Sequence, residues 1–326
     1  ATIVSLLGPE HGIDAAAQDM EVVATAAART AAPTYSLYGD TFASLSPTPA
    51  MLHGAEWLVI DLQDIGSRYY TYVWTAVLAA EVALREGVRV VILDRPNPIG
   101  GLDAQVEGGA IAAGEESFVG LHDVAVRHGM TLGELARMAI LERARAPHAG
   151  LEVLACSGWR RDMLFFETGL PWVLPSPNMP TYGTALVYPG MCLGEGTNVS
   201  EGRGTCRPFE QFGAPWLKSH EVAESLNALH LPGVVFRPCS FTPTFDKFQG
   251  VSCEGAFLHV TDRRAFDPFV TGIAVFQTCR TLGGKDFAWR ADAYEFVDDI
   301  PAFDLLCGTS KVRGGIEAGW PLERIV

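Results

Sequence analysis

The sequence predicts an α/β fold in which a domain built on a parallel sheet is followed by a second α/β domain. A continuous apolar run at 57–60, Trp-Leu-Val-Ile, ends at Asp61, which is typical of a parallel strand buried on both faces. An alanine-rich helix is expected over 73–86, because Gly87 follows it as a stop signal. A second apolar run at 88–93 predicts the next strand. Together these segments form a βαβ unit with parallel strands.

The length of 326 residues and the 48% hydrophobic content are enough for two domains. We expect a helix over 131–145 and a strand over 151–155 near the end of the first domain. The predicted domains are therefore 1–150, with the parallel sheet, and 151–326, an α/β domain that contributes loops to the cleft. The expected elements of the second domain are a helix at 222–229, strands at 234–237 and 256–261, and a helix at 265–281.

The charge and the cysteines exclude several classes of function. A net charge of −14 and a pI near 5.0 argue against nucleic acid as a partner, because phosphate binding needs a basic face. None of the seven cysteines forms a C-x-x-C pair, so a zinc knuckle is not expected and reduced thiols are favoured over a disulfide framework. We find no signal peptide and no apolar run of transmembrane length.

Polar residues follow the predicted strands at the point where each strand ends. An apolar run at 3–7 stops at Gly8-Pro9 and is followed by Glu10 and His11. The corresponding residues after the other strands are Asp61, Asp64, Arg68, Arg95 and Asn97. In open α/β sheets ligands bind beyond the carboxyl ends of the strands, so these side chains are expected to converge on one cleft. The alternative for Glu10 and His11 is a polar loop that is solvated or caps a helix.

Such a cleft would suit acid–base or nucleophilic chemistry on a sugar. Carboxylates act as general acids, general bases or nucleophiles, and the arginine fork fits a carboxylate or phosphate. Tyr69, Tyr70 and Tyr72 offer flat faces of the kind on which sugars pack. The long polar segment 194–205 is either a flexible surface loop or a site that wraps a polar ligand.

Motifs of cofactor and metal enzymes are missing. The sequence has no G-x-x-x-x-G-K-[ST], no G-x-S-x-G and no H-E-x-x-H. Its glycine pairs do not form a dinucleotide fingerprint, so a Rossmann-like sheet is no argument for NAD here. We therefore expect no cofactor. A metal site formed by Glu10, His11 and Asp61 is the disfavoured alternative, because the eight histidines show no paired spacing.

Six motifs, in this order along the chain, resemble those of the NamZ-type exo-β-N-acetylmuramidases, bacterial peptidoglycan hydrolases that were long grouped as a domain of unknown function. The motifs are Gly-Pro-Glu-His-Gly at 8–12, Asp-Leu-Gln-Asp-Ile-Gly-Ser-Arg-Tyr-Tyr-Thr-Tyr at 61–72, Asp-Arg-Pro-Asn-Pro at 94–98, His-Gly-Met-Thr at 128–131, Pro-Ser-Pro-Asn-Met-Pro-Thr at 175–181 and Glu-Gly-Thr-Asn-Val-Ser-Glu-Gly-Arg-Gly-Thr at 195–205. The likeness covers the whole chain.

The resemblance implies a glycosidase that removes terminal N-acetylmuramic acid from the non-reducing end of peptidoglycan fragments. It implies a Rossmann-like first domain that holds the cleft and an α/β second domain that closes over it. Glu10 matches the first catalytic glutamate of the family. Candidates for a second carboxylate are Glu134, placed first, and then Glu195 and Glu201. The alternative for Glu134 is a capping box with Thr131.

The substrate-binding residues follow from the strand ends and the family motifs. The lactyl carboxylate of muramic acid calls for an arginine, for which Arg68 and Arg203 are the candidates. The other expected binding residues are His11, Asp61, Asp64, Tyr70, Asn97, His128, Asn178 and Asn198. The expected partner is thus a peptidoglycan-derived muramyl sugar. The resemblance suggests a secreted or periplasmic enzyme, while the cysteine usage also allows the cytoplasm.

Two other functions stay open at this point. Members of the family usually have a further strand–helix unit before the Gly-Pro-Glu-His-Gly strand, and this chain begins almost at that strand. A truncated relative would hold muramyl sugars without cleaving them. An amidase acting on the peptide stem is the third hypothesis.

Overall fold

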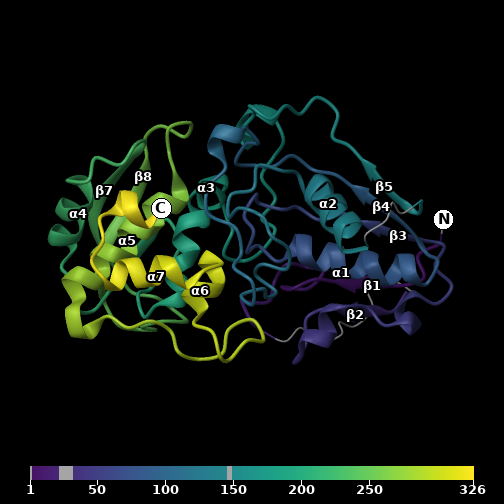
Figure 1. Cartoon of the computed structure of the whole chain (residues 1–326), viewed down its shortest axis with the longest axis horizontal. Helices are drawn as coiled ribbons and strands as arrows, with labels where there is room; N and C mark the ends of the chain where they lie inside the picture. Colours follow the sequence, from purple (N-terminus) through teal and green to yellow (C-terminus); the bar gives the residue numbers. More distant parts are fainter. Residues whose placement is uncertain (1, 22–31, 145–148) are drawn as a thin grey trace. The chain divides into compact units, whose positions relative to one another are not determined.

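The computed structural model describes residues 2–21, 32–144 and 149–326 (Figure 1). The chain forms two compact units, and both combine helices with strands, which confirms the predicted α/β class. The first unit contains 1–66, 70–103 and 129–177, and the second contains 67–69, 104–128 and 178–326. The first unit thus continues beyond residue 150, and the segment 104–128 belongs with the second unit.

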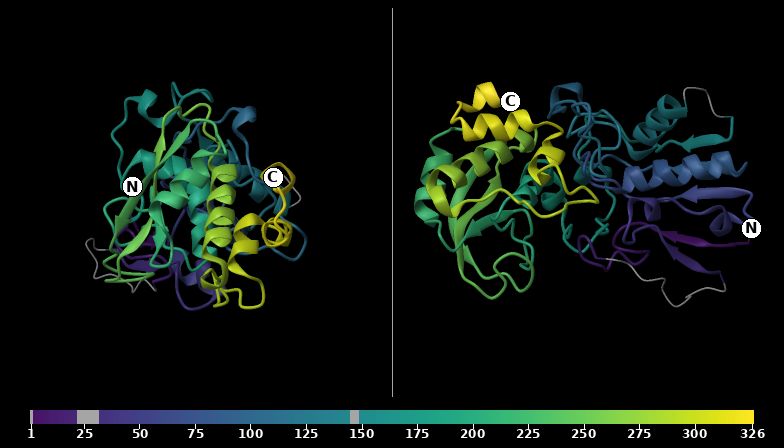
Figure 2. Two further views of the ribbon diagram at one scale, coloured as in Figure 1. Left: turned by 90° about the vertical axis from the view of Figure 1, so that its left-hand side faces the viewer. Right: turned by 60° about the horizontal axis from the view of Figure 1, so that its bottom comes forward.

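The first unit has two parallel sheets. One has the strand order β3-β4-β5, with Val59 opposite Val91 and Val90 opposite Leu151, and the other pairs β1 with β2. The right-hand view of Figure 2 shows α1, in blue, alongside these strands. The bounds are β1 Leu6–Gly8, β2 Thr34–Ser36, β3 Trp57–Ile60, α1 Tyr72–Arg85, β4 Arg89–Leu93, α2 Leu132–Ala144 and β5 Leu151–Leu154. The predicted βαβ unit is confirmed as β3–α1–β4.

The connection from β3 to α1 depends on one glycine. Gly66 has φ +83°, and a Cβ there would lie 2.4 Å from Oδ1 of Asn97. The Asn97 side chain fills this space because it accepts a hydrogen bond from the Ile99 amide and donates one to Met130 O. Only glycine combines the positive φ with the space that Asn97 needs.

The second unit is built on an antiparallel sheet with strand order β6-β8-β7. The helix α3 packs on α5 through glycines, because a Cβ on Gly272 would lie 2.2 Å from the carbonyl oxygen of Gly190. The bounds are α3 Tyr182–Met191, β6 Gln211–Ala214, α4 Ser219–Asn227, β7 Val234–Phe241, β8 Cys253–Val260, α5 Pro268–Gly283, α6 Ala302–Cys307, α7 Ser310–Glu317 and α8 Leu322–Ile325. Short 3-10 helices occupy Phe42–Leu45, Pro49–Leu52, Asp103–Gln105, Phe165–Thr168, Cys192–Gly196 and Gly284–Asp286.

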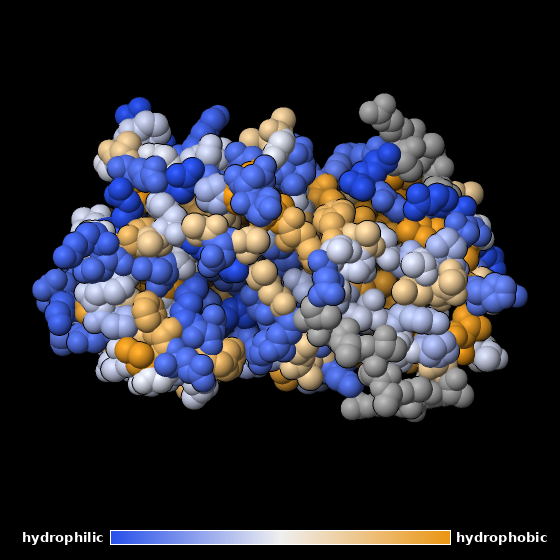
Figure 3. All heavy atoms as spheres, turned by 90° about the horizontal axis from the view of Figure 1, so that it is seen from below, coloured by the Kyte–Doolittle hydropathy of each residue, from blue (hydrophilic) through white to orange (hydrophobic). Residues whose placement is uncertain are grey.

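The surface is mixed in character. Figure 3 shows hydrophilic residues over much of the visible face, with hydrophobic ones between them. Among the helices described, none combines the length and the apolar character needed to cross a membrane.

Candidate functional site

The turn after β1 presents a buried carboxylate, Glu10, which is 3% exposed. Its Oε2 accepts a hydrogen bond of 2.6 Å from the Thr71 hydroxyl, and its Oε1 accepts a longer one, 3.4 Å, from the Met20 amide. Thr71 is the N-cap residue of α1, and the positive end of a helix dipole favours a carboxylate. The Thr71 side chain makes no capping hydrogen bond to its own helix, so its hydroxyl serves Glu10 instead.

The loop from His11 to Met20 folds back on this turn. The His11 carbonyl accepts hydrogen bonds from Ala16 and Ala17, and the Nδ1 atom of His11 lies 2.9 Å from Ala17 O. Three residues of this loop have positive φ without being glycine: His11 (68°), Ala15 (52°) and Met20 (56°). Each such residue costs about 1–3 kcal/mol and persists only where surrounding contacts impose it, which is common at functional sites.

Aromatic rings lie beside the turn. The ring centroid of Tyr72 lies 4.9 Å from that of Tyr70 and 6.3 Å from that of His11. The Tyr72 hydroxyl donates to Pro175 O at 2.6 Å. Burial, and then the nearby Glu10 charge, raise the pKa of Tyr72, and burial likewise raises the pKa of Tyr70. Both phenols therefore stay neutral hydrogen-bond donors at physiological pH.

The other strand-end residues of the first unit hold local structure. Asp61 accepts two hydrogen bonds from Arg95 in an exposed ion pair of 2.6 Å. Asp64 is buried and accepts from the Gly66 amide at 2.7 Å. Asn97 bonds to the backbone as described above. In these contacts all three side chains shape the loops that follow the strands.

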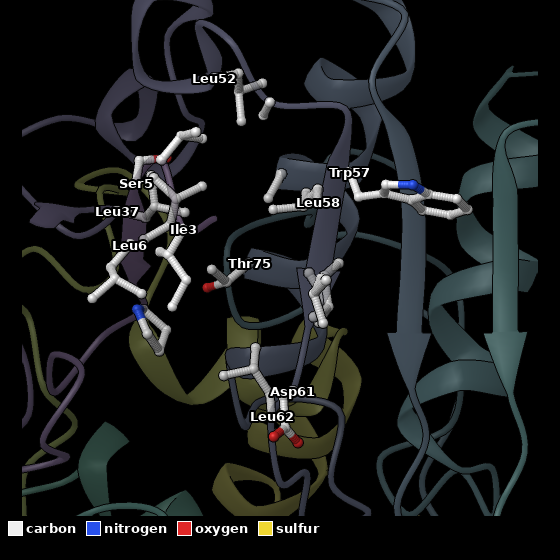
Figure 4. Close-up of a pocket in the computed structure, with 18 of the residues that line it drawn as sticks. Ile3, Ser5, Leu6, Leu37, Leu52, Trp57, Leu58, Asp61, Leu62 and Thr75 are labelled. Carbon is white, nitrogen blue, oxygen red and sulfur yellow. The ribbon is translucent and has the colours of Figure 1, made fainter. Parts of the chain in front are cut away.

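An apolar groove lies between β1 and β3, with a volume of about 680 Å³. Figure 4 shows Ile3 and Leu6 on one side, Trp57 and Leu58 of β3 on the other, and Asp61 at the end of β3. Most of its side chains are aliphatic, and a sugar needs many more hydrogen-bonding partners. This groove is therefore a poor candidate for the sugar site.

Glu134 has the contacts of a capping residue. Its carboxylate accepts from the Thr131 amide at 3.0 Å, and the Thr131 hydroxyl accepts from the Glu134 amide at 3.2 Å. These two bonds form the capping box of α2. The second carboxylate oxygen pairs with Arg161.

A buried network of charges occupies the second unit. Arg203 pairs with Glu195 at 2.5 Å and with Glu201 at 3.2 Å, while Tyr294 donates to Glu195 and Lys247 donates to Glu201. At Glu195 burial raises the pKa, but the Arg203 charge and the Tyr294 hydrogen bond outweigh it and hold the pKa below its usual value. At Glu201 burial prevails over the Lys247 and Arg203 charges, and the pKa is raised. Both glutamates are thus paired with cations of their own chain.

The remaining predicted residues also lie in the second unit. Arg68 is fully buried and donates to the carbonyl oxygens of Gly109, Val124 and Leu306. The Asn198 side chain donates a hydrogen bond to Asp286 O and accepts one from the Ala288 amide, so it holds the backbone at 286–288. His128 and Asn178 are buried.

The structure therefore brings Glu10, His11 and Tyr70 together in the first unit, and Glu195, Glu201 and Arg203 together in the second. Sequence reasoning missed Thr71, although it lies in the 61–72 motif, because nothing in the sequence shows that its hydroxyl reaches Glu10. It also missed Lys247 and Tyr294, which lie outside all six motifs.

Comparisons with known proteins agree with these motifs. The N-terminal family model of the exo-β-N-acetylmuramidase NamZ matches residues 1–183, and the C-terminal model matches residues 186–326. This chain belongs to the NamZ family. The peptidoglycan β-N-acetylmuramidase NamZ of Bacillus subtilis (strain 168) is 46% identical over 326 residues, which are 99% of this chain and 75% of the relative.

Two solved structures share the NamZ-family fold seen here. Both are DUF1343 family proteins from Bacteroides fragilis NCTC 9343. The first has a TM-score of 0.83 at 34% identity and covers 97% of this chain and 79% of its own. The second has a TM-score of 0.73 at 27% identity and covers 99% of this chain and 80% of its own.

Proposed function

We propose that this member of the NamZ family is an exo-acting glycoside hydrolase that releases terminal β-linked N-acetylmuramic acid from peptidoglycan fragments, with Glu10 as its acid–base carboxylate. The family membership supports the reaction and the substrate class. The observation that carries the assignment of Glu10 is its buried carboxylate, held by Thr71 in the turn after β1.

Hydrolysis of a glycoside needs an acid that protonates the departing oxygen. Glu10 suits this task because its two oxygens are bound differently. Oε2 is fixed by the short bond from Thr71, whereas Oε1 has, among the described residues, only the long hydrogen bond from Met20 N. Oε1 is therefore the atom that exchanges a proton with the sugar oxygen in this proposal. The buried rings of Tyr70 and Tyr72 pack against each other beside this turn, with their centroids 4.9 Å apart.

The test is the release of N-acetylmuramic acid from the β-1,4-linked disaccharide of N-acetylmuramic acid and N-acetylglucosamine. Glu10→Gln should lower kcat by about 10²- to 10⁴-fold, the usual contribution of a general acid, and should stay folded. Glu134→Gln is the matched control, because its carboxylate caps α2. Binding without release by the folded wild-type protein would instead support a muramyl-sugar binding module.

A further inference from the structure

The second unit has a pocket formed by the first half of α3, the loop before β6 and the end of β8. Its volume is about 460 Å³, which lies within the range of about 300–1,000 Å³ that is usual for small-molecule sites. The strand β6 pairs with β8 only as far as Phe257, whereas β8 continues to Val260. The pocket therefore lies where β8 extends past β6.

The lining of this pocket carries more positive than negative charge. Arg207 and Arg263 line it, whereas Glu210 is the only carboxylate among the described residues that do so. Glu210 is buried and accepts hydrogen bonds from the Thr181 and Thr184 hydroxyls at 3.1 and 2.9 Å, and it pairs with Arg207 at 3.0 Å. Its charge is thus compensated within the chain. In a protein with a net charge of −14, a local excess of cations favours an anionic ligand.

A histidine adds a further donor to the same pocket. The exposed ring of His259 lines it, and its Nε2 atom accepts a hydrogen bond of 3.2 Å from Arg237 Nε. In the neutral ring the proton therefore lies on Nδ1. The N–H groups of arginine and histidine are the donors that a carboxylate accepts.

One wall of the pocket is flat. The rings of Phe257 and His259 lie on the same face of β8, with their centroids 4.7 Å apart and their planes tilted by 38°. Tyr182 of α3 contributes a further aromatic ring to the lining. A flat apolar surface with a few polar groups beside it suits a sugar ring, whereas the groove between β1 and β3 is almost wholly aliphatic.

We propose that this pocket binds the glycan of peptidoglycan by the lactyl carboxylate of a muramyl residue. Arg263 and His259 bind the carboxylate, and Phe257 contacts the sugar ring. The inference rests on the proposed function, because that function makes peptidoglycan the substrate. Such a site keeps the protein on the insoluble polymer while the chain ends are hydrolysed.

The first measurement is cosedimentation with insoluble peptidoglycan sacculi from which phosphate-containing wall polymers have been removed. All proteins carry Glu10→Gln, so that hydrolysis does not consume the ligand. Arg263→Glu should weaken binding about 10-fold or more, as expected for the loss of a hydrogen bond between charged groups. Arg264→Glu is the matched control, because it changes the net charge equally, is exposed and lies outside the lining of the pocket. Equal binding by these two variants would overturn the inference.

The second measurement identifies the group that is recognised. Free N-acetylmuramic acid should compete for the binding that Arg263→Glu removes, whereas N-acetylglucosamine, which lacks the lactyl carboxylate, should compete about 10-fold less effectively. His259→Ala should also weaken binding, and Arg263→Lys should keep most of it. Equal competition by the two sugars, or binding only to sacculi that retain their phosphate polymers, would contradict the assignment. Circular dichroism checks that each variant folds.

The proposed function is tested separately, by hydrolysis of the muramyl disaccharide by the wild-type protein. If hydrolysis occurs and Arg263→Glu binds sacculi as well as Arg264→Glu does, only the site in the second unit is refuted. Absence of hydrolysis would refute the proposed function itself, whatever the sacculi assay shows.

Discussion

Replacing Thr71 by valine tests how Glu10 is positioned, because it removes the hydroxyl and keeps the shape of the side chain. The lost bond, 2.6 Å from Thr71 Oγ1 to Glu10 Oε2, joins a hydroxyl to a carboxylate. Hydrogen bonds to charged groups contribute about 1.5–3 kcal/mol, which corresponds to a fall in kcat/KM of about 10- to 150-fold. Stability should fall as well, because the same bond stabilises the folded state and its loss leaves the buried Glu10 carboxylate with one hydrogen bond fewer.

The assay is kcat/KM on the muramyl disaccharide, with thermal unfolding measured in parallel. Thr71→Ser keeps a hydroxyl and should recover most of the activity. Thr75→Val is the matched control one turn further along α1, where the buried hydroxyl finds no hydrogen-bond partner among the described residues. Thr75→Val should keep wild-type activity and should be at least as stable as the wild-type protein. If Thr71→Val loses no more activity than Thr75→Val, the positioning argument is wrong.

Four further variants test the packing and the buried charges. Burial outweighs the neighbouring arginine and raises the pKa of Glu107 to about 7 from 4.5, so the folded state keeps a proton that the unfolded chain releases, and stability falls by about 3 kcal/mol as pH rises from 4.5 through 7. The free energy of unfolding of Glu107→Gln, measured with urea at pH 5 and pH 8, should not show this fall. The same fall as in the wild-type protein would contradict the prediction. Gly272→Ala should destabilise by several kcal/mol, because its Cβ meets a carbonyl at 2.2 Å, whereas Gly314→Ala, with open space around it, should gain about 0.5–1 kcal/mol. Equal melting temperatures of these two variants would refute the packing argument. Arg203→Met leaves Glu195 and Glu201 buried without their shared cation and should cost about 3–5 kcal/mol. A loss of less than 1 kcal/mol in the free energy of unfolding would show that this network contributes little to stability.

The sequence predicted the strands of the parallel sheet but not their burial. The apolar runs at 57–60 and 88–93 correspond to β3 and β4, but the expected burial of 57–60 on both faces was wrong, because Trp57 and Val59 are exposed. The helix α3 was missed, because Gly183, Pro189 and Gly190 are unusual in a helix. Its glycine at 190 is explained only by the close approach of α5, a contact between distant parts of the chain.

The site was predictable only in part. The position of Glu10 after an apolar run indicated a carboxylate at the end of a strand. Its partner Thr71 lies 61 residues away, and Lys247 lies 46 residues from Glu201, so neither contact has a local signal. The return of Met20 to Glu10 depends on positive φ values at non-glycine residues, which sequence patterns do not predict.

The most direct test of the account is a crystal structure of Glu10→Gln with the intact muramyl disaccharide bound. The glycosidic oxygen should lie within hydrogen-bond distance of the side-chain amide at position 10. A disaccharide bound in the apolar groove between β1 and β3, or against the Glu195–Arg203 pair with its glycosidic oxygen far from residue 10, would contradict the account.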